Sequence, residues 1–146
     1  MSTPAISLTE TITCNNVYHM FAQEDGLCAV DCSVVVTQDG DGVPVCQLAR
    51  VFVISYLQGN GIARHLLEKA EAIGRENGCK AIRLHAQDDG RIVWRHMRPQ
   101  ARLLDVNGIG AEWRRWSKGE PLPATVGELP EEFAKRCLGY LMEWEL

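Results

Sequence analysis

The chain has 146 residues, of which 46% are hydrophobic, and its formal net charge is −4. This length suits one domain with one core, and the sequence has no run of about 18 apolar residues that could span a membrane. The acidic balance disfavours a nucleic-acid partner and is compatible with a cationic substrate such as an amine. We expect a single domain over residues 1–146, and the polar start of the chain makes the cytoplasm the default location.

The chain has six cysteines, which is many for this length. None of them form a Cys-x-x-Cys pair and several lie in apolar runs, which indicates reduced, buried thiols. A structural zinc site needs four ligands at short paired spacings, and Cys28 with Cys32 is only a loose pair. We therefore expect no metal site.

Two β-rich segments, residues 27–37 and 43–54, flank an Asp-Gly turn at residues 38–42, and this pattern predicts a β-hairpin. Strand alternation places one apolar set on a common face: Cys28, Val30, Cys32, Val34 and Val36. The opposite face is polar enough to border solvent or a cleft, and it carries Asp31. Two interpretations of Asp31 stay open: a solvated carboxylate on the strand and a residue of a functional site.

A helix is predicted over residues 62–77, because apolar residues recur there at helical spacing: Ile62, Leu66, Leu67, Ala70 and Ile73. Asn77-Gly78 supplies its C-terminal stop. The next strand, over residues 81–87, places His85 on the face opposite Ile82 and Leu84, where it looks into a site or into solvent.

Further along, residues 90–97 predict a short helix that Pro99 ends, and residues 101–106 predict another strand. Residues 118–130 predict an irregular connection. The tail from Pro130 predicts an amphipathic terminal helix, because its apolar residues stand at helical spacing: Phe133, Cys137, Leu138, Leu141 and Met142.

Basic and aromatic residues interleave over residues 112–118, around the segment Trp113–Trp116. Such interleaving is found in stacking surfaces for single-stranded nucleic acid and in protein contacts. An edge strand or helix that buries one Trp and solvates the arginines explains the same pattern, and we favour it because large aromatic side chains are usually buried.

The most informative stretch is Gln58-Gly59-Asn60-Gly61-Ile62-Ala63, which joins a predicted strand to the helix predicted from Ile62. A strand that turns through glycines into a helix directs several backbone N–H groups, and the positive end of the helix dipole, at one spot. This spot suits an anion such as a phosphate. The spacing fits neither a Walker loop nor the dinucleotide fingerprint Gly-x-Gly-x-x-Gly.

The stretch resembles the pyrophosphate loop of the GNAT-type N-acetyltransferases, in which Gln or Arg is followed by two residues, Gly, one residue, and Gly or Ala. Gln58, Gly61 and Ala63 match this pattern, and the order strand, loop, helix and strand extends the resemblance over residues 45–86. The resemblance implies that residues 58–63 hold the pyrophosphate of acetyl-CoA, with Gly59, Asn60 and Ile62 within the loop.

The resemblance also implies roles at the end of the preceding strand, where the backbone groups of Phe52 and Val53 bind the pantetheine arm and stabilise the oxyanion. The acid and base differ from the family pattern. The strand before the loop has no Glu or Asp, and Gly90 and Met97 stand where the family commonly has Asn and Tyr. Four residues are candidates for substituted acid or base roles: Asp31, Tyr56, His85 and His96. Of these we prefer His85 as the base.

We therefore expect an α/β (α+β) fold of the GNAT type, with a mixed, mostly antiparallel sheet flanked by helices. The expected function is direct transfer of acetyl from acetyl-CoA to a primary amine of a small molecule, a protein lysine or a protein N-terminus. The alternative is a catalytically weak or inactive module that binds CoA or another protein. The oligomeric state stays open, with a homodimer among the alternatives.

Overall fold

The computed structural model describes residues 9–14, 17–24, 27–53, 61–88 and 90–146. The chain divides into two compact units: residues 1–82 with Leu146, the N-terminal unit, and residues 83–145, the C-terminal unit. The single domain expected over residues 1–146 stays a prediction. None of the helices in the described parts of the chain is long and apolar enough to cross a membrane.

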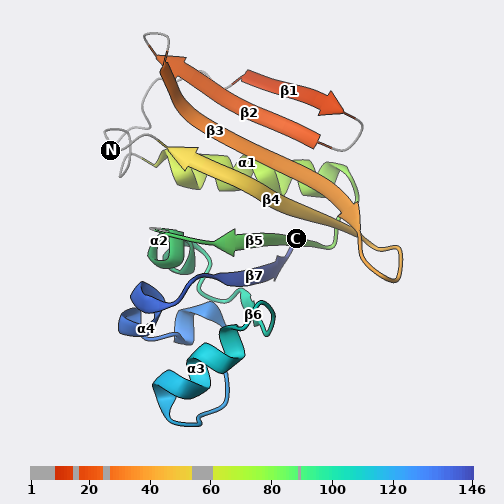
Figure 1. Cartoon of the computed structure of the whole chain (residues 1–146). Coiled ribbons are helices and arrows are strands. Elements are labelled where there is room, and N and C mark those ends of the chain that lie inside the picture. The colour runs from red at the N-terminus through yellow and green to blue at the C-terminus, as the bar shows by residue number, and fades with distance from the viewer. Residues whose placement is uncertain (1–8, 15–16, 25–26, 54–60, 89) are drawn as a thin grey trace. The chain divides into compact units, whose positions relative to one another are not determined.

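The N-terminal unit contains four antiparallel strands that are neighbours in chain order (Figure 1). They are β1 (Thr9–Cys14), β2 (Val17–Glu24), β3 (Leu27–Gln38) and β4 (Pro44–Val53). The predicted hairpin of β3 and β4 is confirmed. In its turn, the Asp39 carboxylate accepts hydrogen bonds from the backbone N–H groups of Asp41 at 2.8 Å and Val43 at 3.0 Å. Strands β1 and β2 were not predicted from the sequence.

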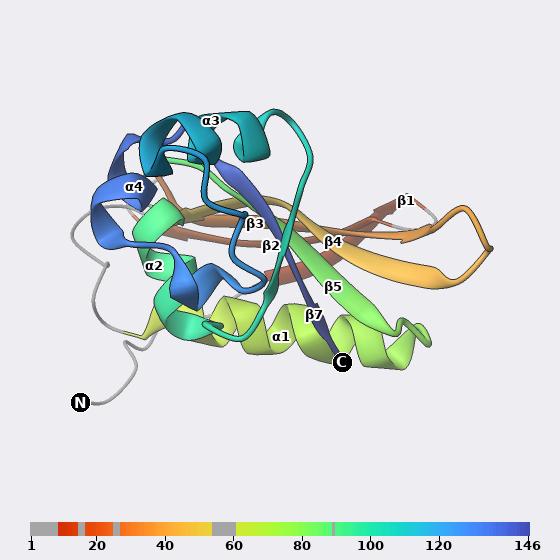
Figure 2. The same ribbon diagram turned by 90° about the horizontal axis from the view of Figure 1, so that it is seen from below.

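The predicted helix is also confirmed, as α1 (Ile62–Glu76), and it lies along one face of β3 and β4 (Figure 2). All of its predicted apolar residues are buried, and they share the core with side chains of the strands: Met20, Val30, Cys32, Val34, Cys46 and Leu48. The contact is close at Cys46, whose Sγ lies 3.8 Å from the Ala70 carbonyl oxygen. Helix α1 thus covers one face of β3 and β4, and Asp31 belongs to the opposite face.

The predicted face of β3 is correct at Val30 and Cys32 but wrong at Cys28, which is exposed while Ala29 is buried. The reason is a β-bulge. In the pairing of β2 with β3, Ala22 pairs with Val30 and the next residue pairs with Cys28, so Ala29 has no partner. One extra residue in a strand reverses the inside and outside positions beyond it.

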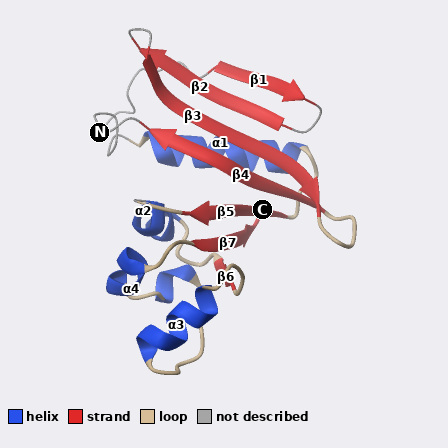
Figure 3. Ribbon diagram, viewed as in Figure 1, coloured by secondary structure: helices blue, strands red, loops and turns tan. Residues whose placement is uncertain are grey.

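The C-terminal unit has three neighbouring strands in the order β5-β7-β6 (Figure 3). They are β5 (Ala81–Ala86), which begins just before the unit boundary, β6 (Arg102–Leu104) and β7 (Tyr140–Glu145). Its helices are α2 (Gly90–Met97), α3 (Ile109–Ser117), the 3-10 turn η2 (Val126–Glu128) and α4 (Glu131–Arg136). Strand β5 and helix α2 agree with the sequence predictions. Strand β6 lies within the strand predicted over residues 101–106 but is shorter.

Aromatic side chains form much of the core of this unit. The rings of Trp113 and Phe133 meet edge to face, with centroids 5.1 Å apart at 89°. The indole N–H of Trp113 donates to the Pro121 carbonyl oxygen at 2.9 Å, so the buried ring leaves no donor unpaired. Trp116 is 36% exposed. As predicted, residues 112–118 bury one Trp and expose Arg114 and Arg115.

The amphipathic terminal helix predicted from Pro130 is wrong. Helix α4 ends at Arg136, and the chain then forms strand β7, in which Tyr140 and Met142 are buried while Leu141 and Glu143 are half-buried. Gly139, at φ 147°, separates the two elements. Its backbone lies so close to β5 that a Cβ atom would be 2.8 Å from the Ala86 carbonyl oxygen. A short apolar run satisfies both the helical and the strand period, so the pattern alone could not exclude a helix.

Candidate functional site

Helix α1 begins at the glycine loop. Gly61 is its N-cap, with left-handed dihedral angles of φ 82° and ψ 3°, and its carbonyl oxygen accepts the His65 N–H at 3.0 Å. No side chain of the described residues caps the helix, and its first turn contains no acidic residue. Within the described part of the chain, no side-chain cap competes with an anion for the backbone N–H groups of this turn. Gln58, Gly59 and Asn60 lie outside the described residues, so their role stays a prediction.

Phe52 and Val53, the residues of the predicted pantetheine contact, are the last described residues of strand β4. In the register of the sheet, Phe52 pairs with Asp31 and Val53 pairs with Val30. The roles of Phe52, Val53, Ile62 and Ala63 toward CoA stay predictions. The register does show that Asp31 is the immediate cross-strand neighbour of a residue expected at the reacting thioester.

Asp31 is paired with His19 of β2. The two atoms Asp31 Oδ1 and His19 Nε2 lie 2.5 Å apart, and the side chains are 16% and 32% exposed. The aromatic ring of Phe21 packs against the imidazole, with ring centroids 5.2 Å apart. Asp31 is therefore half-buried and bonded to an imidazole, and the simple solvated carboxylate that the sequence left open is not what the structure contains.

His19 is a candidate site residue that sequence reasoning missed. The signal was present, because Tyr18, Met20 and Ala22 alternate with His19 and Phe21 as they would in a strand. No strand was assigned to residues 17–24, so nothing placed His19 beside Asp31. Antiparallel pairing sets Ser33 opposite His19 and Asp31 opposite Phe21, which brings the His19 ring within diagonal reach of Asp31.

The other acid or base candidates belong to the C-terminal unit or lie outside the described residues. His85 lies in the C-terminal unit, exposed on β5, and a Cβ atom at Gly139 would be 3.2 Å from its Nε2 atom. His96 is exposed on α2, and Tyr56 lies outside the described residues. The role of His85 as the base stays a prediction that the structure does not test.

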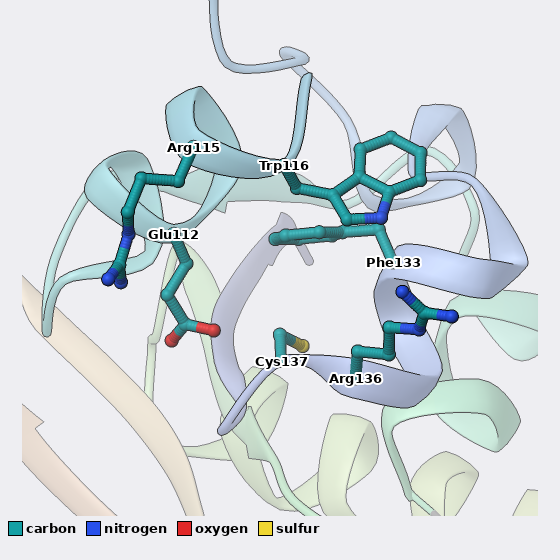
Figure 4. Close-up of a pocket in the computed structure, with 6 residues that line it drawn as sticks. All are labelled: Glu112, Arg115, Trp116, Phe133, Arg136 and Cys137. Carbon is teal, nitrogen blue, oxygen red and sulfur yellow. The ribbon is translucent and has the colours of Figure 1, made fainter. Parts of the chain in front are cut away.

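A pocket of about 360 Å³ lies in the C-terminal unit, between α3 and the segment of α4 (Figure 4). Its lining residues are Glu112, Arg115, Trp116, Phe133, Arg136 and Cys137. Burial raises the pKa of the Cys137 thiol. A raised pKa keeps a thiol protonated at neutral pH and lowers its nucleophilicity.

Of the five cysteines whose burial is described, Cys28 is exposed and four are buried: Cys32, Cys46, Cys79 and Cys137. Burial raises the pKa of each of these four thiols. Among the residues that the structure describes, no three or more His, Cys, Asp or Glu side chains are grouped so that they could hold a metal ion.

Comparison with solved structures finds similar folds at low sequence identity. The PaiA N-acetyltransferase from Thermoplasma acidophilum, in complex with coenzyme A, is 13% identical with a TM-score of 0.56, and the match covers 90% of this chain and 62% of that one. A GNAT-family acetyltransferase from Staphylococcus aureus Mu50 is 15% identical with a TM-score of 0.54, with 88% and 68% covered. The chain thus spans about two thirds of the length of these proteins. The expected mixed, mostly antiparallel fold with flanking helices is confirmed.

Comparison with curated protein sequences finds no significant match. The family model for the acetyltransferase (GNAT) family matches residues 9–97. This match includes all four strands of the N-terminal unit, the glycine loop, α1, β5 and α2. Because it extends over more than half of the chain, it decides the family: this chain belongs to the acetyltransferase (GNAT) family.

Proposed function

We propose that the chain transfers the acetyl group of acetyl-CoA directly to a primary amine of a small molecule, a protein lysine or a protein N-terminus. Membership of the acetyltransferase (GNAT) family supports this proposal. The observation that carries it is the start of α1. The helix begins at a left-handed glycine inside the motif of residues 58–63, and its first turn has no acidic side chain.

The first turn of α1 suits the pyrophosphate of CoA for a physical reason. Its backbone N–H groups have no partner within the helix, and the helix dipole adds a partial positive charge at the same place. A diphosphate gains several hydrogen bonds there, and a carboxylate in the first turn would repel it. The structurally similar PaiA N-acetyltransferase from Thermoplasma acidophilum was solved in complex with coenzyme A.

The end of β4 is the proposed place of the thioester. Free backbone groups at Phe52 and Val53 would hold the pantetheine arm, and an N–H there would donate to the oxyanion that forms when the amine attacks. One such donor lowers the barrier by about 3 kcal/mol. The acyl transfer would then depend on positioning and on a group that receives the proton of the amine.

The start of α1 can be tested with a matched pair of glycine variants. Gly61 caps α1 at φ 82° and ψ 3°, and Gly108 caps α3 at φ 84° and ψ 3°. An alanine at either position loses roughly 1–2 kcal/mol, because Cβ clashes in the left-handed region. Gly61→Ala and Gly108→Ala should therefore lower Tm similarly, so a difference between them in ligand response reports on the loop.

Acetyl-CoA should raise the Tm of the wild-type chain and of Gly108→Ala by the same amount, whereas acetate should not. At an acetyl-CoA concentration one hundred times Kd, binding should stabilise the folded chain by about 2.7 kcal/mol. The shift should be much smaller for Gly61→Ala, because an added Cβ obstructs the approach of phosphate to the loop. An equal shift in both variants, or none in the wild type, would contradict the proposed cradle.

A second function has a specific observation in its favour. Gly90 and Met97 stand where the family commonly has Asn and Tyr, so a chain that binds CoA without efficient transfer is the alternative. Stabilisation by acetyl-CoA without release of free thiol across a panel of primary amines would favour this non-catalytic module.

A further inference from the structure

We propose that His19 is the general base of the acetyl transfer and that Asp31 is its positioning residue, because the two side chains meet on the sheet face opposite α1, one strand from Phe52. This inference rests on the proposed function and adds to it the group that receives the proton. The family pattern predicts a base on β4, whereas His19 lies on β2 and Asp31 on β3.

The pairing register places the pair beside the proposed thioester. Two neighbouring rows cross β2, β3 and β4: one row is His19, Ser33 and Arg50, and the other is Phe21, Asp31 and Phe52. Adjacent strands are about 4.8 Å apart, so β2 is about 10 Å from β4. The His19 ring leans over β3 so that Nε2 meets Asp31. Nδ1 then lies on the ring edge away from that carboxylate, and the bound amine would reach it directly or through one water molecule.

The hydrogen bond decides which ring nitrogen is basic. A carboxylate only accepts hydrogen bonds, so the 2.5 Å contact assigns the proton to Nε2 and leaves the lone pair on Nδ1. Among the described residues, no group is bonded to Nδ1. The carboxylate also stabilises the imidazolium that forms when Nδ1 accepts a proton, as a third group does when it orients a catalytic base.

The surroundings hold this arrangement in place. Phe21 packs against the imidazole at 5.2 Å and limits its rotation, and Asp31 is 16% exposed, so the contact is shielded from most of the solvent. The other charged residue in these two rows is Arg50, and Glu10 of β1 pairs with Met20 in the next row. With a neutral imidazole the contact is a hydrogen bond to a carboxylate, and it becomes an ion pair only when Nδ1 accepts a proton. This change of charge beside a fixed carboxylate is what suits the pair to proton handling.

The reaction balances with one base. Nδ1 of His19 takes a proton from the ammonium group, directly or through one water molecule, and the neutral amine nitrogen attacks the acetyl carbonyl carbon. The C–N bond forms, the C–S bond breaks, and the departing thiolate takes the second proton lost by the nitrogen. The imidazolium then returns its proton to solvent, so the products are the amide, free CoA thiol and one proton.

The test uses the full chain, acetyl-CoA and three amine probes: spermidine, a lysine-containing peptide with a blocked N-terminus, and a peptide with a free N-terminus. Release of CoA thiol is followed against pH. His19→Gln keeps an N–H donor toward Asp31 but has no base, so kcat should fall about 10²–10⁴-fold and the rise of kcat/KM near neutral pH should disappear. The KM for acetyl-CoA should not change.

Asp31→Asn tests the positioning role. An amide N–H donates to Nε2, which moves the imidazole proton to Nδ1 and removes the basic lone pair from the site. We expect a loss of at least tenfold in kcat, with the histidine ¹⁵N shifts reporting the opposite tautomer from the wild type. Asp41→Asn is the matched control, because Asp41 is exposed in the β3–β4 turn, and it should keep wild-type activity and shifts.

The outcomes separate the two proposals. If the wild type releases thiol and His19→Gln matches it in kcat and pH profile, the base assignment is overturned while the acetyltransferase stands. If acetyl-CoA raises Tm but no amine reacts, the base assignment falls and CoA binding alone remains. If acetyl-CoA neither binds nor reacts, the proposed function itself fails.

Discussion

Glu143 of β7 holds two guanidinium groups from two neighbouring strands. Its Oε2 lies 2.5 Å from Nε of Arg83 on β5, and its Oε1 lies 2.7 Å from Nη2 of Arg102 on β6. Glu143 is 14% exposed, whereas Arg83 is 36% and Arg102 is 66% exposed. The carboxylate therefore has one partly shielded partner and one partner that is mostly in solvent.

Substitutions at these three residues should lower stability unequally. Hydrogen bonds to charged groups contribute about 1.5–3 kcal/mol when shielded, and exposed ion pairs contribute less than about 1 kcal/mol. Glu143→Gln and Arg83→Gln should each lower the free energy of unfolding by about 1–2 kcal/mol, and Arg102→Gln by less than about 1 kcal/mol. Urea denaturation measures all three, and a larger loss for Arg102→Gln than for Arg83→Gln would contradict this ranking.

Single residues were predicted with uneven success, for a physical reason. Asp31 could be singled out because a carboxylate within an apolar strand is unusual. His19 could not be connected to it, because the contact depends on the register between two strands, and register follows from turns and bulges rather than from composition. The residues of the glycine loop from Gly61 onward were predicted from their chemistry, and Gly61 does have the left-handed geometry that the motif suggested.

At the scale of elements, Gly139 decides that α4 is followed by a strand. Both Gly139 and Gly119 have positive φ, at 147° and 97°, but only Gly139 is close to other backbone. A Cβ at Gly139 would lie 2.8 Å from the Ala86 carbonyl oxygen, whereas a Cβ at Gly119 would have no atom within 4 Å. Alanine at Gly119 therefore introduces backbone strain alone, whereas alanine at Gly139 introduces the same kind of strain together with steric overlap.

Gly139→Ala should therefore destabilise the chain more than Gly119→Ala does. Both variants carry the strain of an alanine at positive φ, and Gly139→Ala adds an overlap that should lower the free energy of unfolding by a further 1–3 kcal/mol or so. The comparison is made by urea denaturation of the two variants and the wild type. Equal losses would mean that the β5–β7 approach can widen without penalty.

Elements with a long, regular pattern were predicted well and short ones were not. Helix α1 has fifteen residues with five buried apolar positions at helical spacing, so its pattern admits one period only. The tail from Pro130 is short and its apolar residues fit two periods, so the strand β7 was mistaken for a continuation of α4. Tertiary contact with β5, which the sequence does not display, makes the choice.

For the whole molecule, buried thiols predict a loss of stability at alkaline pH. Burial, and then the charge of Asp31, raises the pKa of Cys32 to about 12, and burial with the nearby Cys79 and Cys32 raises that of Cys46 to about 12. In the unfolded chain such thiols ionise above about pH 8.5. Between these limits the unfolded state binds fewer protons than the folded state, so stability falls as pH rises.

The slope should approach about 1.4 kcal/mol per pH unit for each thiol that is ionised only in the unfolded state. Cys32→Val keeps a similar volume in the core and removes one such thiol, so its free energy of unfolding should decline less steeply than that of the wild type. Urea denaturation at intervals from pH 8 to pH 11, under reducing conditions, measures both slopes. Parallel curves for the two proteins would show that Cys32 does not contribute.

The family and the fold class were accessible from the sequence because one motif lies between two well-patterned elements, and the match over residues 9–97 agrees with that interpretation. Strands β1 and β2 were missed because residues 9–24 carry a mixture of polar and apolar residues in two short strands. The sequence therefore predicted the residues proposed to bind CoA but not His19, because His19 belongs to β2, a strand that was missed.

The bulge at Ala29 has a practical consequence. Without that extra residue, Cys28 would point to the same side as Val30; with it, Cys28 is the exposed thiol among the five cysteines whose burial is described. In a Cys14→Ser background, a maleimide dye should attach to Cys28 at neutral pH while the four buried thiols stay unmodified. Because Cys28 and Asp31 are on the same strand, the emission of that dye offers a direct optical signal for the arrival of small molecules at the sheet, with no engineered attachment point.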